Sequence, residues 1–254
     1  MTRRRWIAEH WDEATATLVG AQAEHMARVL RAQKGMEADV VAGGHVFHAE
    51  VAAITLDGDQ SEVRFNLVAE FEADPALPIT LVVSIYKFDH MEWAIEKATE
   101  LGVAAIAPVI ARQTEKHLAA AAGKRAERWR RIVHEAAQQA RRSDVPIIFD
   151  PAPLAVRVRA ASEATRADSG TTCIVLAEQE RTTTLRYALE EAVTAAGTET
   201  PRLEIAIGPE GGWAPSEEAL FDANGWSAAS LGPRILRAET AAIAALAVVA
   251  SYLE

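Results

Sequence analysis

The chain reads Ile205-Ala206-Ile207-Gly208-Pro209-Glu210-Gly211-Gly212-Trp213 at a point where an apolar run ends in a glycine-rich loop. Short apolar runs that end in glycines are typical of buried parallel strands whose carboxyl ends carry a ligand-binding loop. A second loop of this kind follows, Leu231-Gly232-Pro233-Arg234-Ile235-Leu236-Arg237-Ala238-Glu239-Thr240. If the two loops close together, they form a ligand pocket.

The first loop does not match the standard phosphate-binding motifs. It lacks the Lys-Ser/Thr that ends a P-loop and the glycine spacing of a dinucleotide fingerprint. Glu210 also stands where an anion would approach, so the loop suits a neutral or cationic ligand better than a pyrophosphate. A glycine-rich turn that binds nothing is the alternative for this loop taken alone.

The second loop concentrates charge beside apolar residues. Arg234, Arg237 and Glu239 lie within one short segment. Half-buried ion pairs are costly unless a ligand or a structural requirement compensates. This density of charge favours a binding site over a plain turn.

The composition indicates a globular protein with a sizeable core, because half of the 254 residues are hydrophobic. No apolar run is long enough to cross a bilayer and the amino terminus has no signal-peptide core, so we expect a cytoplasmic protein. Cys173 is the single cysteine, which excludes an intrachain disulfide. The histidines show no metal-ligand spacing, so no metal site is expected.

The charge balance limits how this chain could bind nucleic acid. Its 36 acidic residues outnumber its 26 basic residues, which argues against a protein whose whole surface binds RNA. Any RNA contact must therefore come from local basic clusters, although a solvated face is the alternative interpretation of each cluster. The candidate RNA-binding residues are Arg3, Arg4, Arg5, Arg28, Arg31, Arg141 and Arg142.

Residues before about position 75 indicate a small β-barrel. Apolar side chains alternate with polar ones along two segments, so each segment should present one face to a core. The expected core faces comprise Phe47, Ala49, Val51 and Ala53, and Val63, Phe65 and Leu67. A helix is expected at 21–33, and the proline-containing segment 73–78 indicates a linker.

Beyond the linker, continuous apolar runs alternate with amphipathic helices, a pattern typical of a parallel sheet covered on both faces. The long helix at 124–142 should turn its arginines away from the core. The last helix, 240–253, is apolar nearly all round, which favours burial against the sheet and a second subunit. The expected strands are 79–85, 103–110, 146–149, 172–177, 203–207 and 227–231.

Four segments together resemble a known family. They are Ile207–Trp213, Leu231–Ala241, the run from His90 to Val103 (HMEWAIEKATELGV), and the run from Glu135 to Arg142 (EAAQQARR). Together they resemble the RsmE family of 16S ribosomal RNA (uracil-N3) methyltransferases, which belongs to the SPOUT superfamily. Phe88 departs from the pattern, since the family is expected to have a glycine there.

The resemblance implies an α/β fold in which a SPOUT-type, trefoil-knotted parallel-sheet methyltransferase domain at 78–254 follows a PUA-like β-barrel RNA-binding domain at 1–73. Fold rules alone would give an open doubly wound sheet, because threaded chains are rare. The resemblance also implies a homodimer, with 16S ribosomal RNA or the small ribosomal subunit as its partner and no membrane association.

The implied cofactor is S-adenosyl-L-methionine, and the implied reaction methylates N3 of a uridine, position 1498 in this family. Glycines in the loops would let the backbone approach the cofactor closely. Apolar side chains would enclose the adenine. The implied cofactor-binding residues are Leu176, Ala177, Glu178, Ile207, Gly208, Pro209, Gly211, Gly212, Leu231, Gly232, Ile235, Leu236 and Thr240.

Methylation of a uracil N3 requires the loss of a proton, so a general base or a cation that stabilises the developing oxyanion is needed. Glu210 and Glu239 are candidate bases, and Arg237, less readily Arg234, could stabilise charge on the uracil oxygens. Helix capping by Glu239 and Thr240 is an alternative that is compatible with catalysis.

Two other functions stay open at this point. The chain could be an RNA-binding or ribosome-assembly module with a vestigial pocket, although the intact glycines in both loops argue against this. It could also be a methyltransferase of the same superfamily that modifies a ribose hydroxyl. Such a product would leave the base able to pair.

Overall fold

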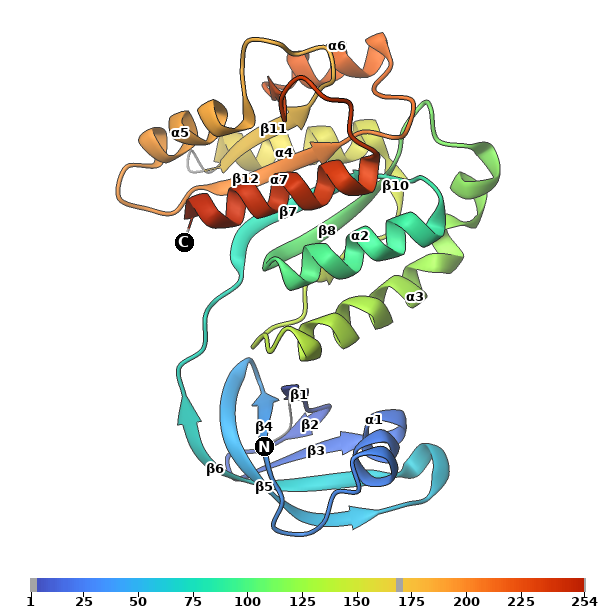
Figure 1. Ribbon diagram of the computed structural model, residues 1–254, viewed down its shortest axis with the longest axis vertical. Helices are drawn as coiled ribbons and strands as arrows, with labels where there is room; N and C mark the ends of the chain where they lie inside the picture. The colour runs from blue at the N-terminus through green and yellow to red at the C-terminus, as the bar shows by residue number, and fades with distance from the viewer. Residues whose placement is uncertain (1–3, 168–170, 254) are drawn as a thin grey trace. The chain divides into compact units, whose positions relative to one another are not determined.

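The computed structural model describes residues 4–167 and 171–253, so Arg3 lies outside the described residues. The chain forms two units, each with its own sheet (Figure 1). The first unit comprises residues 1–75 together with 135–145, and the second comprises 76–134 together with 146–254.

The first unit is built on a six-stranded sheet in the order β1-β4-β5-β6-β3-β2, with antiparallel pairing except between β1 and β4. The segment 6–11 joins the two ends of this order. Its first half hydrogen-bonds to β4 and its second half to β3, through Ala8 N–H to the Val41 oxygen and Glu9 N–H to the Thr17 oxygen. The strands are β1 (Trp6–Ile7), β2 (His10–Trp11), β3 (Thr15–Val19), β4 (Glu37–Ala42), β5 (His45–Thr55) and β6 (Glu62–Phe71).

The expected core faces of this sheet are confirmed except at one position. Ala49, Val51, Val63 and Phe65 are buried, and Phe47 and Leu67 pack against the same core. Strand β5 bulges between Val51 and Ala53. Because a bulge inserts one residue and reverses the alternation beyond it, Ile54 takes the place that the pattern predicts for Ala53.

The helix expected at 21–33 is shorter and less regular than predicted. It begins as α1 (Gly20–Glu24), continues as a π-helical turn, η1 (His25–Val29), and ends where Arg31 adopts a φ of 53°. The wider π turn keeps Met26 fully buried but directs Val29 to solvent at 64% exposure. A 3-10 turn, η2 (Gly58–Gln60), joins β5 to β6.

The second unit contains a parallel sheet in the order β10-β8-β7-β12-β11-β13, with β9 also pairing with β8. All six strands expected here are present, with ends shifted by a few residues. The two-residue strand β10 is the one missed, because it is too short to leave an apolar pattern. The strands are β7 (Leu77–Ser84), β8 (Val103–Ile110), β9 (Ile147–Ile148), β10 (Ala152–Pro153), β11 (Thr171–Leu176), β12 (Arg202–Ile207) and β13 (Ser227–Ala229).

Helices cover both faces of this sheet. On one face α2 (Phe88–Glu100) and α7 (Ala238–Leu253) pack side by side, with α5 (Leu185–Ala196) against α7 (Figure 1). On the other face α4 (Leu154–Ala167) and α6 (Pro215–Ala223) share a core with alternate strand residues such as Val82 and Ala206. Burial on both faces explains why the strands are continuous apolar runs.

Helix α3 (Lys116–Gln139) begins earlier than the predicted 124, because Leu118 and Ala122 extend its buried stripe. It ends before the predicted 142, since Arg141 has a positive φ of 59°. Its residues from 135 onward belong to the first unit. No helix in residues 4–167 or 171–253 is long and apolar enough to span a membrane.

A buried ion pair joins α4 to the middle of the sheet. Arg157 donates to both carboxylate oxygens of Glu204 on β12 at 2.5 Å, and Glu204 is 8% exposed. Burial raises the pKa of the Glu204 carboxyl, and the charge of Arg157 opposes this rise. The pair is therefore expected to matter chiefly because either partner alone would be a buried, uncompensated charge.

We predict that Arg157→Met lowers the free energy of unfolding by about 3 kcal/mol at neutral pH, because it leaves Glu204 without a counter-charge. The folded pKa of Glu204 then rises further above its ordinary value of 4.5. A carboxyl group whose folded pKa is raised contributes less stability as pH increases, so the deficit should grow as pH rises above 4.5. Denaturant unfolding from acidic to neutral pH measures it.

Arg186→Met is the matched control, since Arg186 forms an exposed pair with Glu190 at 3.0 Å. Such pairs contribute about 0.3–0.5 kcal/mol. Equal deficits for the two variants, or a deficit at Arg157 that does not change with pH, would contradict the assignment.

Candidate functional site

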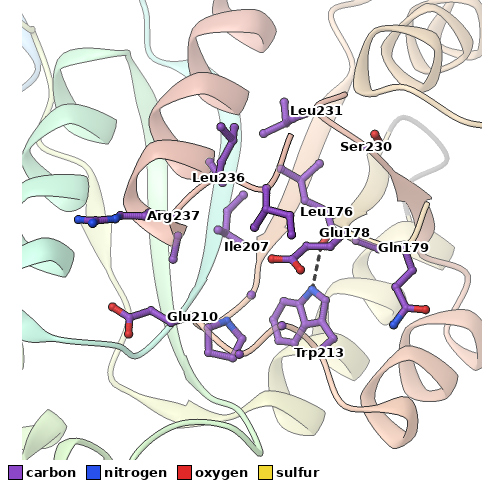
Figure 2. Close-up of a pocket in the computed structure, with 18 of the residues that line it drawn as sticks. Leu176, Glu178, Gln179, Ile207, Glu210, Trp213, Ser230, Leu231, Leu236 and Arg237 are labelled. Atoms are coloured by element: carbon purple, nitrogen blue, oxygen red, sulfur yellow. Dashed lines mark hydrogen bonds between the residues drawn. The ribbon is translucent and has the colours of Figure 1, made fainter. Parts of the chain in front are cut away.

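A cavity of about 530 Å³ opens at the carboxyl ends of β11, β12 and β13, which lie next to one another in the sheet (Figure 2). Cavities of this size commonly hold a small molecule or cofactor. The loops that follow the three strands supply most of its wall, and the start of α2 supplies Lys87 and His90. The wall includes all the predicted cofactor-binding residues except Thr240, together with Glu210, Trp213, Arg234 and Arg237.

The loop after β12 is held by its tryptophan. The indole N–H of Trp213 donates to the carbonyl oxygen of Leu176 at 3.0 Å, which ties this loop to the end of β11 (Figure 2). Trp213 is 9% exposed and meets the ring of Phe221 edge-on, as expected for core packing. A Cβ at Gly208 would lie 3.2 Å from the indole ring, so a side chain there would displace it.

The loop after β13 contributes to the apolar part of the wall. Gly232 has a φ of +109°, a conformation that other residues rarely adopt. Figure 2 shows Leu231 and Leu236 together with Leu176 and Ile207 around the cavity. An apolar surface of this kind can pack against a flat aromatic ring.

The loop after β11 is ordered by one carboxylate. Glu180 Oε1 accepts the Thr182 N–H and hydroxyl at 2.6 Å and the Thr183 N–H at 2.9 Å. These hydrogen bonds lower the pKa of Glu180 to about 2. Glu178, Gln179 and Arg181 of this loop line the cavity.

The three predicted catalytic residues occupy two different environments. Glu210 and Arg237 are exposed and line the cavity. Glu239 is 5% exposed, does not line the cavity, and lies 3.4 Å from His90 Nδ1. Helix α7 begins at Ala238, so Thr240 is exposed within its first turn instead of capping it.

Three residues near the cavity were not singled out from the sequence. Lys87 and His90 line it. Tyr86 is buried, and burial is the main cause that raises the pKa of its phenol; the carboxylates of Glu239 and Glu210 raise this pKa further. The segment that begins at His90 carried part of the family resemblance, which was the available signal. It gave no role for the histidine.

The basic residues expected to contact RNA differ in how far their side chains are engaged. Arg5 is buried, donates to the Arg141 carbonyl oxygen and lies over the ring of Phe71. Arg142 is also buried and pairs with Asp144 at 2.6 Å.

Arg141 pairs with the buried Asp39 at 2.5 Å. Arg4 lies over the Trp6 ring, Arg28 pairs with Glu24 at 3.3 Å, and Arg31 is exposed. Their contacts with RNA stay predictions.

Phe88, the departure from the family pattern, forms the first residue of α2. It packs edge-on against Trp129 of α3 and lies under the guanidinium of Arg125 at 4.8 Å. The side chain thus fills a helix contact beside the cavity wall. Within the described part of the chain, no group of three or more His, Cys, Asp or Glu could hold a metal ion.

The family model for the RNA methyltransferase domain matches residues 73–250. Ribosomal RNA small subunit methyltransferase E of Synechocystis is 35% identical over 95% of this chain and 75% of its own length. The Bacillus subtilis protein of the same name is 30% identical over 94% of this chain and 91% of its own length. The chain belongs to this family.

A solved structure of ribosomal RNA small subunit methyltransferase E from Neisseria gonorrhoeae, bound to S-adenosyl methionine, is similar over 98% of this chain and 97% of its own length. Its TM-score is 0.79 and its sequence identity is 28%. The similarity to this methyltransferase E structure therefore extends over both units.

We predict that Glu180→Ala loosens the loop after β11, because the Thr182 and Thr183 amides lose their acceptor. Hydrogen exchange at these two amides should become faster while exchange in β11 stays unchanged. In the unmodified protein the protection should be complete above the ordinary glutamate pKa of 4.5 and lost as pH falls toward about 2.

Glu178→Ala is the control, since Glu178 lies in the same loop and lines the cavity. Faster exchange at Thr182 in this variant too would show that the loop depends on its overall charge and not on Glu180.

Proposed function

We propose that this chain is an S-adenosyl-L-methionine-dependent methyltransferase that methylates N3 of a uridine, position 1498, in 16S ribosomal RNA. The observation that carries the proposal is the convergence of three strand-end loops on one cavity in a chain of the methyltransferase E family. S-adenosyl-L-methionine supplies an electrophilic methyl group when it is bound.

The cavity fits this cofactor in shape and in chemistry. A Cβ at Gly208 would press on the Trp213 ring that supports the wall, and Gly232 has a φ of +109°, so both glycines are needed for the shape of this wall. Leu231 and Leu236 provide an apolar surface for an adenine. Glu178 and Glu210 lie in the wall and would favour a cationic sulfonium over an anionic ligand.

Glu210 and Arg237 are the two predicted catalytic residues with access to the cavity. A uracil N3 must lose its proton before or during methyl transfer, and the Glu210 carboxylate can accept it. The Arg237 guanidinium can stabilise the charge that develops on a uracil carbonyl oxygen. Much of the rate would come from holding donor and acceptor in line.

For the first unit we propose a PUA-like barrel that positions the RNA. The bonds of the segment 6–11 to β4 and to β3, which lie near opposite ends of the strand order, support a closed sheet. For the second unit we propose the SPOUT arrangement, in which the last strand–loop units thread through one another. We also propose a homodimer. Helix α7 is apolar nearly all round, and it leaves Val248 and Tyr252 exposed at 40% and 37%, so a second subunit could cover them. A cytoplasmic location follows from the proposed substrate.

The substrate assignment is tested by primer extension on 16S ribosomal RNA from cells that lack this protein. Methylation at N3 blocks Watson–Crick pairing and stops reverse transcription, so the stop at position 1498 should disappear in these cells and return with the wild-type gene. A persistent stop would refute the assignment. Ribose methylation leaves pairing intact and would give no such base-specific stop.

We predict that Trp213→Phe weakens binding of S-adenosyl-L-methionine by roughly twofold to tenfold, as measured by calorimetry. The ring would still pack on Phe221, but the hydrogen bond to the Leu176 carbonyl would be lost, and one such bond contributes about 0.5–1.5 kcal/mol.

Trp226→Phe is the matched control. Trp226 is also buried and also packs on Phe221, but its indole N–H has no hydrogen-bond partner among the described residues. Its variant should keep the wild-type affinity. An equal loss of affinity in the two variants would mean that the size of the indole ring, and not its hydrogen bond to Leu176, determines the shape of the cavity.

A further inference from the structure

Glu239 carries a carboxylate that is buried beside the cavity and is incompletely paired. It lies in the first turn of α7, and its Oε2 atom has no hydrogen-bond partner within residues 4–167 and 171–253. Its Oε1 atom lies 3.4 Å from Nδ1 of His90. Burying a carboxylate is costly unless an opposite charge lies close. A positive charge on His90 would offset this cost for Glu239.

His90 lies between two carboxylates. In the first turn of α2, its Nε2 atom is 3.8 Å from Oδ2 of Asp89, while Nδ1 faces Glu239. Neither contact is a hydrogen bond, and Nδ1 has no hydrogen-bond partner among the described residues. What His90 can supply to the two carboxylates is therefore the positive charge of its imidazolium.

The other ionisable groups around His90 cannot replace it as the counter-charge. Tyr86 follows β7, and its phenol is buried and without a hydrogen-bond partner among the described residues. Burial, then the carboxylates of Glu239 and Glu210, raise the pKa of Tyr86, so the phenol stays uncharged at neutral pH. Lys87 and Arg237 are exposed in the cavity wall, where water screens their charge.

Glu239 is connected directly to the cavity wall. It follows Leu236, Arg237 and Ala238, which all line the cavity, and the Ala241 N–H donates to the Arg237 oxygen at 2.8 Å as the helix begins. A displacement of Glu239 would therefore move Arg237. Glu239 itself does not line the cavity, so any effect on the reaction passes through this wall.

We propose that His90 is a positioning residue for methyl transfer: its imidazolium is the counter-charge that holds Glu239 and, through it, the wall that carries Arg237. The proposal rests on the methyltransferase activity proposed above. Removing the charge while keeping the size of the side chain should therefore loosen this wall.

The test compares wild type with His90→Lys and His90→Gln. Methylation of 16S ribosomal RNA, supplied as small ribosomal subunits from cells that lack the protein, is measured at neutral pH and saturating S-adenosyl-L-methionine. Lysine keeps a cation at this position. Glutamine keeps a hydrogen-bonding side chain of similar size without the charge.

The lysine variant should retain a kcat close to that of wild type, because it keeps a positive charge beside Glu239. The glutamine variant should lose kcat on the order of tenfold to a hundredfold, with little change in KM for the RNA, as expected when reacting groups are displaced.

His117→Lys is the control, because His117 is exposed, lies 3.5 Å from Glu115 and does not line the cavity. Its kcat should equal that of wild type. Thermal unfolding shows whether each variant folds, and if the glutamine variant does not, the lysine variant still decides.

Two results would overturn the proposal while wild type remains active. An inactive but folded lysine variant would show that His90 transfers a proton in the reaction and does not merely supply a positive charge. A glutamine variant as active as wild type would show that the counter-charge has no role. If wild type itself neither binds S-adenosyl-L-methionine nor methylates the RNA, the proposed function fails, and this is seen before any variant is compared.

Discussion

The parallel pairing of β11 with both β12 and β13 is the constraint on which the site depends. In this register Val175 lies beside Ala206 on one side and Ala228 on the other, so the three strands end close together at one edge. Their following loops must then open at the same place. The bond from Trp213 to Leu176 fixes two of these loops to each other, and the third completes the wall.

Much of the second unit could be predicted from the sequence because its strands are buried on both faces. Continuous apolar runs and helical periodicity marked the strands and the main helices without any knowledge of their neighbours. Local irregularities could not be predicted in this way. The bulge after Val51 and the π turn at His25 change which residues face the core, and neither has a distinct pattern of polarity.

The site was only partly accessible from the sequence, for a different physical reason. The glycine loops after β12 and β13 carry their own signal, since glycine is needed for their backbone geometry. His90 and Glu239 are far apart in the chain and meet only because α2 packs against α7. Glu239 was expected in the cavity, but the helix starts at Ala238 and turns this side chain into the helix contact.

The buried acids among the described residues are held in different ways. Asp39 and Glu204 each face an arginine at 2.5 Å, and Asp39 also lies 3.0 Å from Nδ1 of His48. Glu217 accepts two backbone N–H groups. Of these four buried acids, Glu239 is the one that keeps a carboxylate oxygen without a hydrogen-bond partner within the described residues.

Residues 135–145 belong to the first unit although they follow part of the second unit in the chain, and this limits how the gene can recombine. A single crossover at the linker near residue 75 would transfer the sheet but leave Arg141 behind, and Asp39 would then be a buried acid without its guanidinium. Recombination must preserve two separate stretches of the gene together. The first unit is therefore not a portable module, and its sequence should change in step with the end of α3.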